Sequence, residues 1–182
     1  MGQSSLEEAL KGCQVSVITL PEGELHWTNE RPEDVKACIP AAFSDENGNI
    51  VGEYRLGGKT YGKRKYRVLV SIRPNTFYVD KKWHGDEGFQ QLALVYEGKV
   101  MHFKDDRKFV RRALCKNKQG YFLLESDVAM TLSAFAVCCG KVANEAIYLD
   151  MGSCGYGYVG SRILSPVAFL SRNKQTNWLY VK

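Results

Sequence analysis

The sequence predicts an α+β fold in which a mixed, mostly antiparallel sheet carries one main helix packed on it. Short runs rich in β-branched and aromatic residues recur between glycine-containing turns along most of the chain, a pattern typical of strands. Only residues 130–140 repeat apolar side chains at helical spacing, through Leu132, Phe135, Ala136 and Cys139. Many strands and a single helix do not fit a doubly wound parallel sheet.

The first half of the chain is expected to be almost entirely β. Residues 14–20 alternate as a half-buried strand, and residues 25–27 are expected to pair with them. Residues 37–49 run as a strand into a turn centred on Asn47 and Gly48. The further strands expected along the chain are residues 50–56, 67–72, 91–96, 99–103, 111–115, 120–125 and 146–149.

The turns between these strands are also visible in the sequence. Glu97-Gly98 is typical of a two-residue hairpin loop, and residues 116–119 are expected to connect a second hairpin. Gly140 is placed to end the helix in a left-handed cap. Residues 83–88 are expected to form an exposed loop.

Length and composition predict one domain over residues 1–182. Hydrophobic residues make up 45% and charged residues 25% of the chain, which excludes a disordered composition. No apolar run approaches the ~20 residues that a transmembrane helix needs, so no transmembrane segment is expected.

The net charge of +5 favours an anionic partner. Basic residues gather in residues 59–67, where Tyr61 and Tyr66 lie between them, and a solvated strand edge explains the same pattern. The 20 acidic residues nearly balance the 25 basic ones, and no nucleic-acid motif occurs, so a nucleic-acid partner is not favoured.

The six cysteines and three histidines do not form a pattern of metal ligands. No Cys-x-x-Cys is present and the histidines are scattered, so no metal site is predicted and no cofactor is assigned. Cys154 offers a thiol nucleophile with His84 or His102 as its base, but Tyr156 breaks the glycine spacing of a nucleophile elbow.

The most informative segment is residues 145–160. An apolar strand ends in a carboxylate, Asp150, and opens at once into a turn that holds Gly152, Ser153, Gly155 and Gly157. Glycine removes side-chain bulk, so such a turn lets a ligand approach the carboxylate closely. The alternative is a hairpin in which glycine supplies positive φ and Asp150 accepts hydrogen bonds from local amides.

Several segments, in this order along the chain, resemble the phosphodiester glycosidase family. The Asn-Ala-Gly-Phe-Phe-Asp stretch of that family is similar to residues 40–45, and its Leu-Asp-Gly-Gly-Gly-Ser signature is similar to residues 149–153 in a shortened form. Pro40 and Ala42 replace the family's Asn and Gly. The other similar segments are residues 111–113 and 120–124, residues 130–132, and Arg172 with residues 177–181.

The resemblance implies a hydrolase that cleaves the glycosidic bond of a sugar-1-phosphodiester, or that acts on another anionic glycan. It implies Asp150 as the catalytic carboxylate, Arg111 as the cation on the phosphate and Asp127 as a second acid, all three in one cleft. It further implies substrate binding by a second group of residues, namely Gly152, Ser153, Gly155 and Arg172.

Other interpretations remain open at this point. Arg111 also fits a surface strand residue, and Asp127 also fits an acid that favours the N-terminus of the following helix. Because Pro40 has no side-chain amide, the chain also fits a catalytically degenerate member that binds a glycan or phosphorylated ligand. The family implies a secreted or periplasmic protein, whereas residues 1–12 lack the layout of a secretory signal, so the compartment and the oligomeric state stay open.

Overall fold

The computed structural model describes residues 3–151, 155–164 and 174–182, which form two compact units. Unit 1 consists of Met1–Thr19 and Ala93–Tyr148, and unit 2 of Leu20–Leu92 and Leu149–Lys182. The single domain expected over residues 1–182 stays a prediction.

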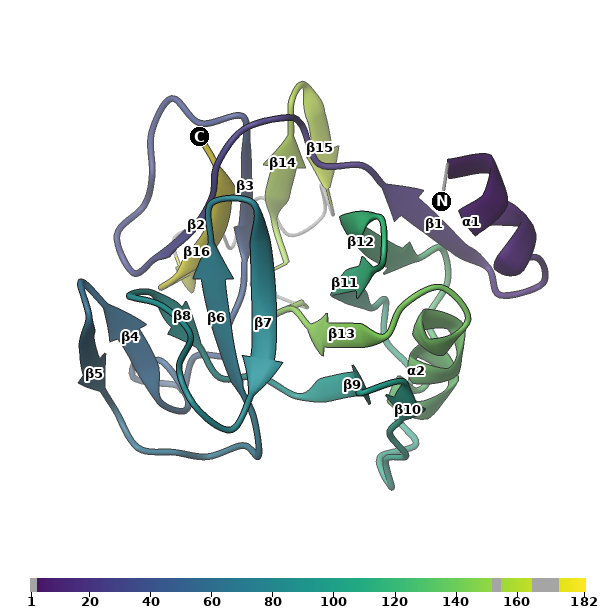
Figure 1. The fold of residues 1–182 in the computed structure, drawn as a ribbon. Helices are drawn as coiled ribbons and strands as arrows, with labels where there is room; N and C mark the ends of the chain where they lie inside the picture. The colour runs from purple at the N-terminus through teal and green to yellow at the C-terminus, as the bar shows by residue number, and fades with distance from the viewer. Residues whose placement is uncertain (1–2, 152–154, 165–173) are drawn as a thin grey trace. The chain divides into compact units, whose positions relative to one another are not determined.

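The described residues are mostly β, and the predicted α+β class with one main helix is wrong. Their strands form three antiparallel sheets, of six, five and five strands, beside two short helices (Figure 1). The longer helix has only 9 residues, too few to form a layer of its own. The sequence pattern predicts this helix because its apolar residues repeat at helical spacing. The same pattern does not show that the strands form three sheets, so it gives the helix too large a part in the fold.

Unit 1 contains the six-stranded sheet, with strand order β1-β12-β11-β13-β9-β10. Helix α2 packs against β9, β10 and β13, and helix α1 lies beside β1 (Figure 1). The bounds in chain order are α1 (Gln3–Ala9), β1 (Val15–Ile18), β9 (Ala93–Tyr96), β10 (Lys99–Val100), β11 (Arg112–Asn117), β12 (Gly120–Ser126), α2 (Leu132–Gly140) and β13 (Glu145–Tyr148).

Helix α2 begins and ends for identifiable reasons. The Thr131 side chain caps its N-terminus by accepting a hydrogen bond from the Ala134 amide at 3.1 Å. Gly140 is the last helical residue, but it does not adopt the expected left-handed cap, and Lys141 follows it in right-handed helical geometry. A Cβ at this position would displace the side chain of Val100 in β10.

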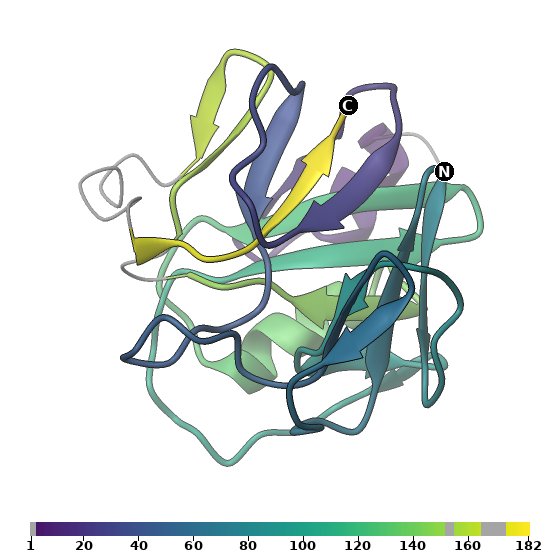
Figure 2. The same cartoon turned by 90° about the vertical axis from the view of Figure 1, so that its left-hand side faces the viewer.

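Unit 2 contains the two five-stranded sheets. One has the order β15-β14-β3-β16-β2, and the other has the order β5-β4-β8-β6-β7 (Figure 2). Strand β2 contacts β6 and β8 of the second sheet, where Trp27 stacks on Phe89 with ring centroids 5.9 Å apart. The bounds are β2 (Leu25–Thr28), β3 (Ala37–Pro40), β4 (Tyr54–Leu56), β5 (Lys59–Tyr61), β6 (Leu69–Arg73), β7 (Thr76–Asp80), β8 (Gly88–Phe89), β14 (Gly157–Val159), β15 (Arg162–Leu164) and β16 (Trp178–Val181).

Two predicted hairpins are confirmed and one predicted pairing is wrong. Strands β9 and β10 meet across Glu97 and Gly98, both of which have positive φ, and β11 and β12 form the other hairpin. The expected pairing of residues 14–20 with residues 25–27 does not occur, because β1 pairs with β12 and β2 pairs with β16.

Candidate functional site

Asp150 lies two residues beyond β13 and is buried, with 8% of its surface exposed. Its backbone N–H donates to the Ala41 carbonyl at 2.9 Å, directly after β3. The acid therefore sits at the end of a strand beside the Pro40–Ala42 backbone. Burial of a carboxylate costs free energy unless other groups stabilise its charge. Buried carboxylates are therefore often found at catalytic or binding sites, and Asp150 is a candidate for such a role.

The side chain of Asn177 holds the next residue of the same segment. Its Oδ1 accepts from the Ala42 N–H at 2.7 Å, and its Nδ2 donates to the Ala42 carbonyl at 3.0 Å. The same Oδ1 accepts from the Trp27 indole N–H at 3.1 Å. Because Asn177 is buried, these bonds fix the backbone next to Asp150.

Two adjacent glutamines, both completely buried, complete this framework. Gln91 donates from Nε2 to the Ala41 carbonyl at 3.3 Å, the same oxygen that accepts the Asp150 N–H. Gln90 accepts from the Lys65 N–H at 2.8 Å and donates to the Tyr66 carbonyl at 2.8 Å. Gln90 therefore holds the backbone of the basic segment 63–67, while the adjacent Gln91 holds Ala41, to which the Asp150 N–H is bonded.

Tyr66 is an ionisable residue of the segment that Gln90 holds. Burial raises the pKa of the Tyr66 phenol above its ordinary value, and the negative charge of Asp150 raises it further. Tyr66 therefore keeps its proton at neutral pH.

The glycines after Asp150 have separate structural roles where the structure describes them. Gly155 is buried. Gly157 lets β14 approach β3, because a Cβ there would lie 2.9 Å from the Cys38 carbonyl oxygen. Three predicted binding residues, Gly152, Ser153 and Arg172, lie outside the described residues, as does Cys154.

Arg111 lies in unit 1, just before β11, and is 6% exposed. Its guanidinium donates to the Met130 carbonyl at 3.1 Å, to the Arg107 carbonyl at 2.8 Å and to the Tyr148 hydroxyl at 3.5 Å. It also lies over the Phe109 ring at 5.1 Å. Arg111 is therefore a buried arginine that connects segments of unit 1, and not a surface strand residue.

Asp127 is exposed and follows the last residue of β12. Its Oδ1 accepts from the Ser16 hydroxyl at 2.6 Å. The cap of α2 is supplied by Thr131 instead, so Asp127 does not have the capping role that its position in the sequence also allowed.

The predicted residues divide between the two units. Arg111 and Asp127 belong to unit 1 and Asp150 to unit 2, so that their convergence in one cleft stays a prediction. The two histidines considered as bases divide in the same way, with His102 in unit 1 and His84 in unit 2. His84 bonds through Nε2 to Asp80 at 2.6 Å.

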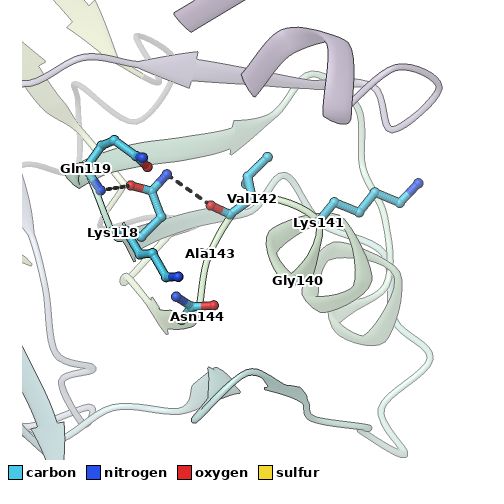
Figure 3. A pocket seen from close by; sticks show the side chains of 8 residues that line it. Lys118, Gln119, Gly140, Lys141, Val142, Ala143 and Asn144 are labelled. Atoms are coloured by element: carbon cyan, nitrogen blue, oxygen red, sulfur yellow. Dashed lines mark hydrogen bonds between the residues drawn. The ribbon is translucent and has the colours of Figure 1, made fainter. Parts of the chain in front are cut away.

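A separate pocket of about 300 Å³ lies in unit 1 beside the β11–β12 turn (Figure 3). In the close-up Lys118 points toward Asn144, while Asn117 donates to the Val142 carbonyl at 3.3 Å. None of the predicted catalytic residues lines it. The lining residues are Asn117, Lys118, Gln119, Gly140, Lys141, Val142, Ala143 and Asn144.

Neither a metal cluster nor a membrane-spanning helix is found in the part of the chain that the structure describes. No group of three or more histidine, cysteine, aspartate or glutamate side chains is arranged there to hold a metal ion. No helix there has the length and apolarity to cross a bilayer.

Comparison with solved structures identifies the fold. The catalytic domain of zebrafish N-acetylglucosamine-1-phosphodiester alpha-N-acetylglucosaminidase, auto-inhibited by its pro-peptide, matches with a TM-score of 0.57 and 15% sequence identity. The match covers 94% of this chain and 73% of that one. The two chains share a fold.

A second similar structure is a hypothetical protein from Synechocystis, with a TM-score of 0.51 and 11% identity. That match covers 96% of this chain and 58% of the other, so the chain spans little more than half of that protein. No protein-family model and no curated protein matches the sequence. At these identities the comparisons show the fold alone.

Sequence reasoning missed most of the residues around Asp150. The sequence pattern indicates only that Tyr66 is an aromatic residue within a basic cluster, and it indicates no role for Gln90 and Gln91. The available signal was a pair of amides within an otherwise apolar run, residues 89–95, because amides in such a run must find buried hydrogen-bond partners.

Proposed function

We propose that the chain is a divergent phosphodiester glycosidase, a hydrolase that cleaves the glycosidic bond of a sugar-1-phosphodiester. The observation that supports this most is the meeting of three family-like segments within unit 2. The Asp150 N–H bonds to Ala41, and the Asn177 side chain bonds to Ala42, so residues 149–151, 40–45 and 177–181 assemble around one buried carboxylate.

In the proposed reaction the leaving group hardly needs protonation by a general acid. Water adds to the anomeric carbon, and the bond from that carbon to the phosphate oxygen breaks with its electron pair leaving on the phosphomonoester, which is a weak base. The proton of the water passes to a base. The main requirement is a negative charge beside an oxocarbenium-like centre, which Asp150 supplies in this proposal.

Arg111 and Asp127 complete the proposed catalytic set. Within the described residues, three of the five N–H groups of the Arg111 guanidinium donate to Met130, Arg107 and Tyr148. The proposal assigns the other two to a phosphate oxygen. Asp127 is exposed and is the proposed second acid. Gly152, Ser153, Gly155 and Arg172 are the proposed substrate-binding residues.

A second candidate function is binding of a glycan or phosphorylated ligand without cleavage. The observation that favours it is Pro40, which is buried in β3 opposite Trp178 and offers no side-chain hydrogen-bond donor where the family has an amide. A catalytic site that lacks one polar group can retain ligand binding while losing transition-state stabilisation.

A panel of synthetic sugar-1-phosphodiesters that differ in sugar and in aglycone tests the proposal. Hydrolysis is followed by the release of both free sugar and phosphomonoester, so that cleavage of the phosphate–aglycone bond is distinguished. Release of both products supports the glycosidase. Saturable binding of panel members without release favours the second candidate, and neither release nor binding contradicts both.

A further inference from the structure

Phe109 is an exposed aromatic residue of unit 1, in the segment that leads into β11. It is 48% exposed, although large apolar side chains are most often buried. Its backbone is held by Met130, since the Phe109 N–H donates to the Met130 carbonyl at 3.2 Å and the Met130 N–H donates back at 2.9 Å. Val110 and Val128, on the same two segments, are also exposed. Exposed apolar side chains that occur together in this way mark binding surfaces.

Two guanidinium groups contact the Phe109 ring. The Cζ atom of Arg111 lies 5.1 Å and that of Arg107 lies 5.7 Å from the centroid of the ring. Asp105 binds the guanidinium of Arg107, and its carboxylate accepts from Nε at 2.9 Å and from a terminal nitrogen at 2.6 Å. The charge of Arg107 is therefore paired, whereas Arg111 is the cation to which the proposed function assigns the phosphate.

Arg111 keeps a fixed position under this ring. It is 6% exposed, and its guanidinium donates to the carbonyls of Met130 and Arg107 and to the Tyr148 hydroxyl. A buried guanidinium with these partners does not follow its ligand across the surface. A phosphate bound to Arg111 must therefore lie close to the Phe109 ring, and so must the groups joined to that phosphate.

We propose that the Phe109 ring binds the aglycone of the substrate and selects phosphodiesters whose aglycone presents an apolar group next to the phosphate. This assignment rests on the proposed function, in which Arg111 binds the phosphate. The aglycone is joined to the phosphate through a single oxygen atom, so its first carbon atoms lie beside the phosphate. The ring of Phe109 has no hydrogen-bond donor or acceptor, and it therefore favours an apolar group at this place.

The aglycone, rather than the sugar, is the group assigned to Phe109, because a sugar presents hydroxyl groups that need hydrogen-bond partners. The exposed side chains of Val110 and Val128 offer no such partner, and the guanidinium of Arg107 is already bound by Asp105. An alkyl or aryl group loses no hydrogen bonds to water when it lies on this surface. The surface therefore suits an apolar aglycone better than a sugar ring.

Binding of two phosphomonoesters tests the assignment without requiring turnover. Methyl phosphate and benzyl phosphate both carry the phosphate that Arg111 would bind, and they differ in the aromatic ring of the aglycone. Isothermal titration gives the affinity of each for wild type. We expect wild type to bind benzyl phosphate about tenfold more tightly than methyl phosphate, because the added ring leaves water on contact with Phe109.

Variants of Phe109 show whether this preference depends on the ring. Phe109→Ala should reduce the preference for benzyl phosphate to less than about threefold, and Phe109→Tyr, which retains a ring, should restore it. Tyr78→Ala is the matched control, because Tyr78 is another exposed aromatic residue, at 41%. It should leave the preference as in wild type.

A purely structural role of Phe109 predicts a different result. If the ring only shields the guanidinium of Arg111, Phe109→Ala should weaken the binding of methyl phosphate and benzyl phosphate by the same factor. The preference for benzyl phosphate would then be equal in wild type and Phe109→Ala, which would overturn the assignment. Absence of benzyl phosphate binding by wild type would also overturn it.

The outcomes distinguish this assignment from the proposed function. A preference for benzyl phosphate that depends on Phe109, in a protein that hydrolyses no member of the phosphodiester panel, retains the assignment and rejects the glycosidase. Methyl and benzyl phosphodiesters of the same sugar test the reverse case. If wild type and Phe109→Ala hydrolyse both with equal kcat/KM, the glycosidase is retained and the assignment is rejected.

Discussion

Asn177 satisfies three polar groups of unit 2 with one buried side chain. It pairs with the N–H and the carbonyl of Ala42 and accepts from the Trp27 indole. Asn177→Ala should leave these groups without their partner, at about 1–3 kcal/mol for each unsatisfied buried group. We expect a loss of about 3 kcal/mol or more in the free energy of unfolding, measured by urea denaturation.

Asn47→Ala is the control for this change, because Asn47 is exposed. It should alter the free energy of unfolding by less than about 0.5 kcal/mol. A loss in Asn177→Ala no larger than that in Asn47→Ala would show that the framework around Ala42 does not depend on this side chain.

Single residues show how far the sequence could specify the candidate site. Asp150 was found because an acid at the end of an apolar run, followed by glycines, is a local pattern. Gln91 reaches it only through Ala41, whose carbonyl accepts hydrogen bonds from residues about 50 and about 110 positions away in sequence, and no local pattern records such distances. The sequence around Asp127 predicts a role at the following helix. Its actual partner, Ser16, lies on the neighbouring strand β1, 111 positions away in sequence.

Strand pairing in unit 2 depends on one glycine. The Cβ of Gly157→Ala would lie 2.9 Å from the Cys38 carbonyl oxygen and 3.3 Å from the Ile39 Cα, which are rigid backbone atoms of β3. We expect the pairing of β14 with β3 to loosen, with faster hydrogen exchange of the backbone amides in both strands and a lower melting temperature.

Gly85→Ala is the matched control for Gly157→Ala. Its Cβ would meet the Arg73 Cδ at 3.0 Å, the flexible part of a long side chain that can move aside. Exchange in β14 and β3 should then remain as in wild type. If Gly157→Ala also leaves that exchange unchanged, the account of the β14–β3 pairing is wrong.

At the level of elements, local turns were predictable and the sheet order was not. Glu97-Gly98 and the β11–β12 turn are decided by residues next to each other, so both hairpins could be identified. The partners of β1 and β2 lie about 110 and 150 residues away in sequence, at β12 and β16, which short-range patterns cannot record. The overstated helix has the same origin, since its periodicity was visible and the three-sheet arrangement was not.

The whole molecule should lose stability at alkaline pH. Burial raises the pKa of the Cys38 thiol to about 12 from 9.0, and burial together with a hydrogen bond to Cys13 raises that of Cys138 to about 12. Since each folded-state pKa lies above the unfolded value, the stabilisation is complete below pH 9.0 and is lost as the pH rises toward about 12. Each thiol contributes a slope on the order of 1 kcal/mol per pH unit.

Urea denaturation at a series of pH values between 8 and 11, under reducing conditions, measures this loss. Cys38→Ala removes the contribution of one thiol and should make the fall in the free energy of unfolding less steep than in wild type. A free energy of unfolding independent of pH in this range, or the same slope in Cys38→Ala, would contradict the assignment.

The role of Asp150 as a catalytic carboxylate is the central claim, and Asp150→Asn tests it most directly. The amide keeps the shape of the side chain and removes the charge that stabilises the transition state. Wild type and variant are compared for sugar release from the best member of the phosphodiester panel and for melting temperature. We expect turnover to fall by at least about a thousandfold, with the melting temperature nearly unchanged. Undiminished turnover, or a large drop in melting temperature that accounts for the lost activity, would contradict the catalytic role and identify Asp150 as a structural residue of the turn.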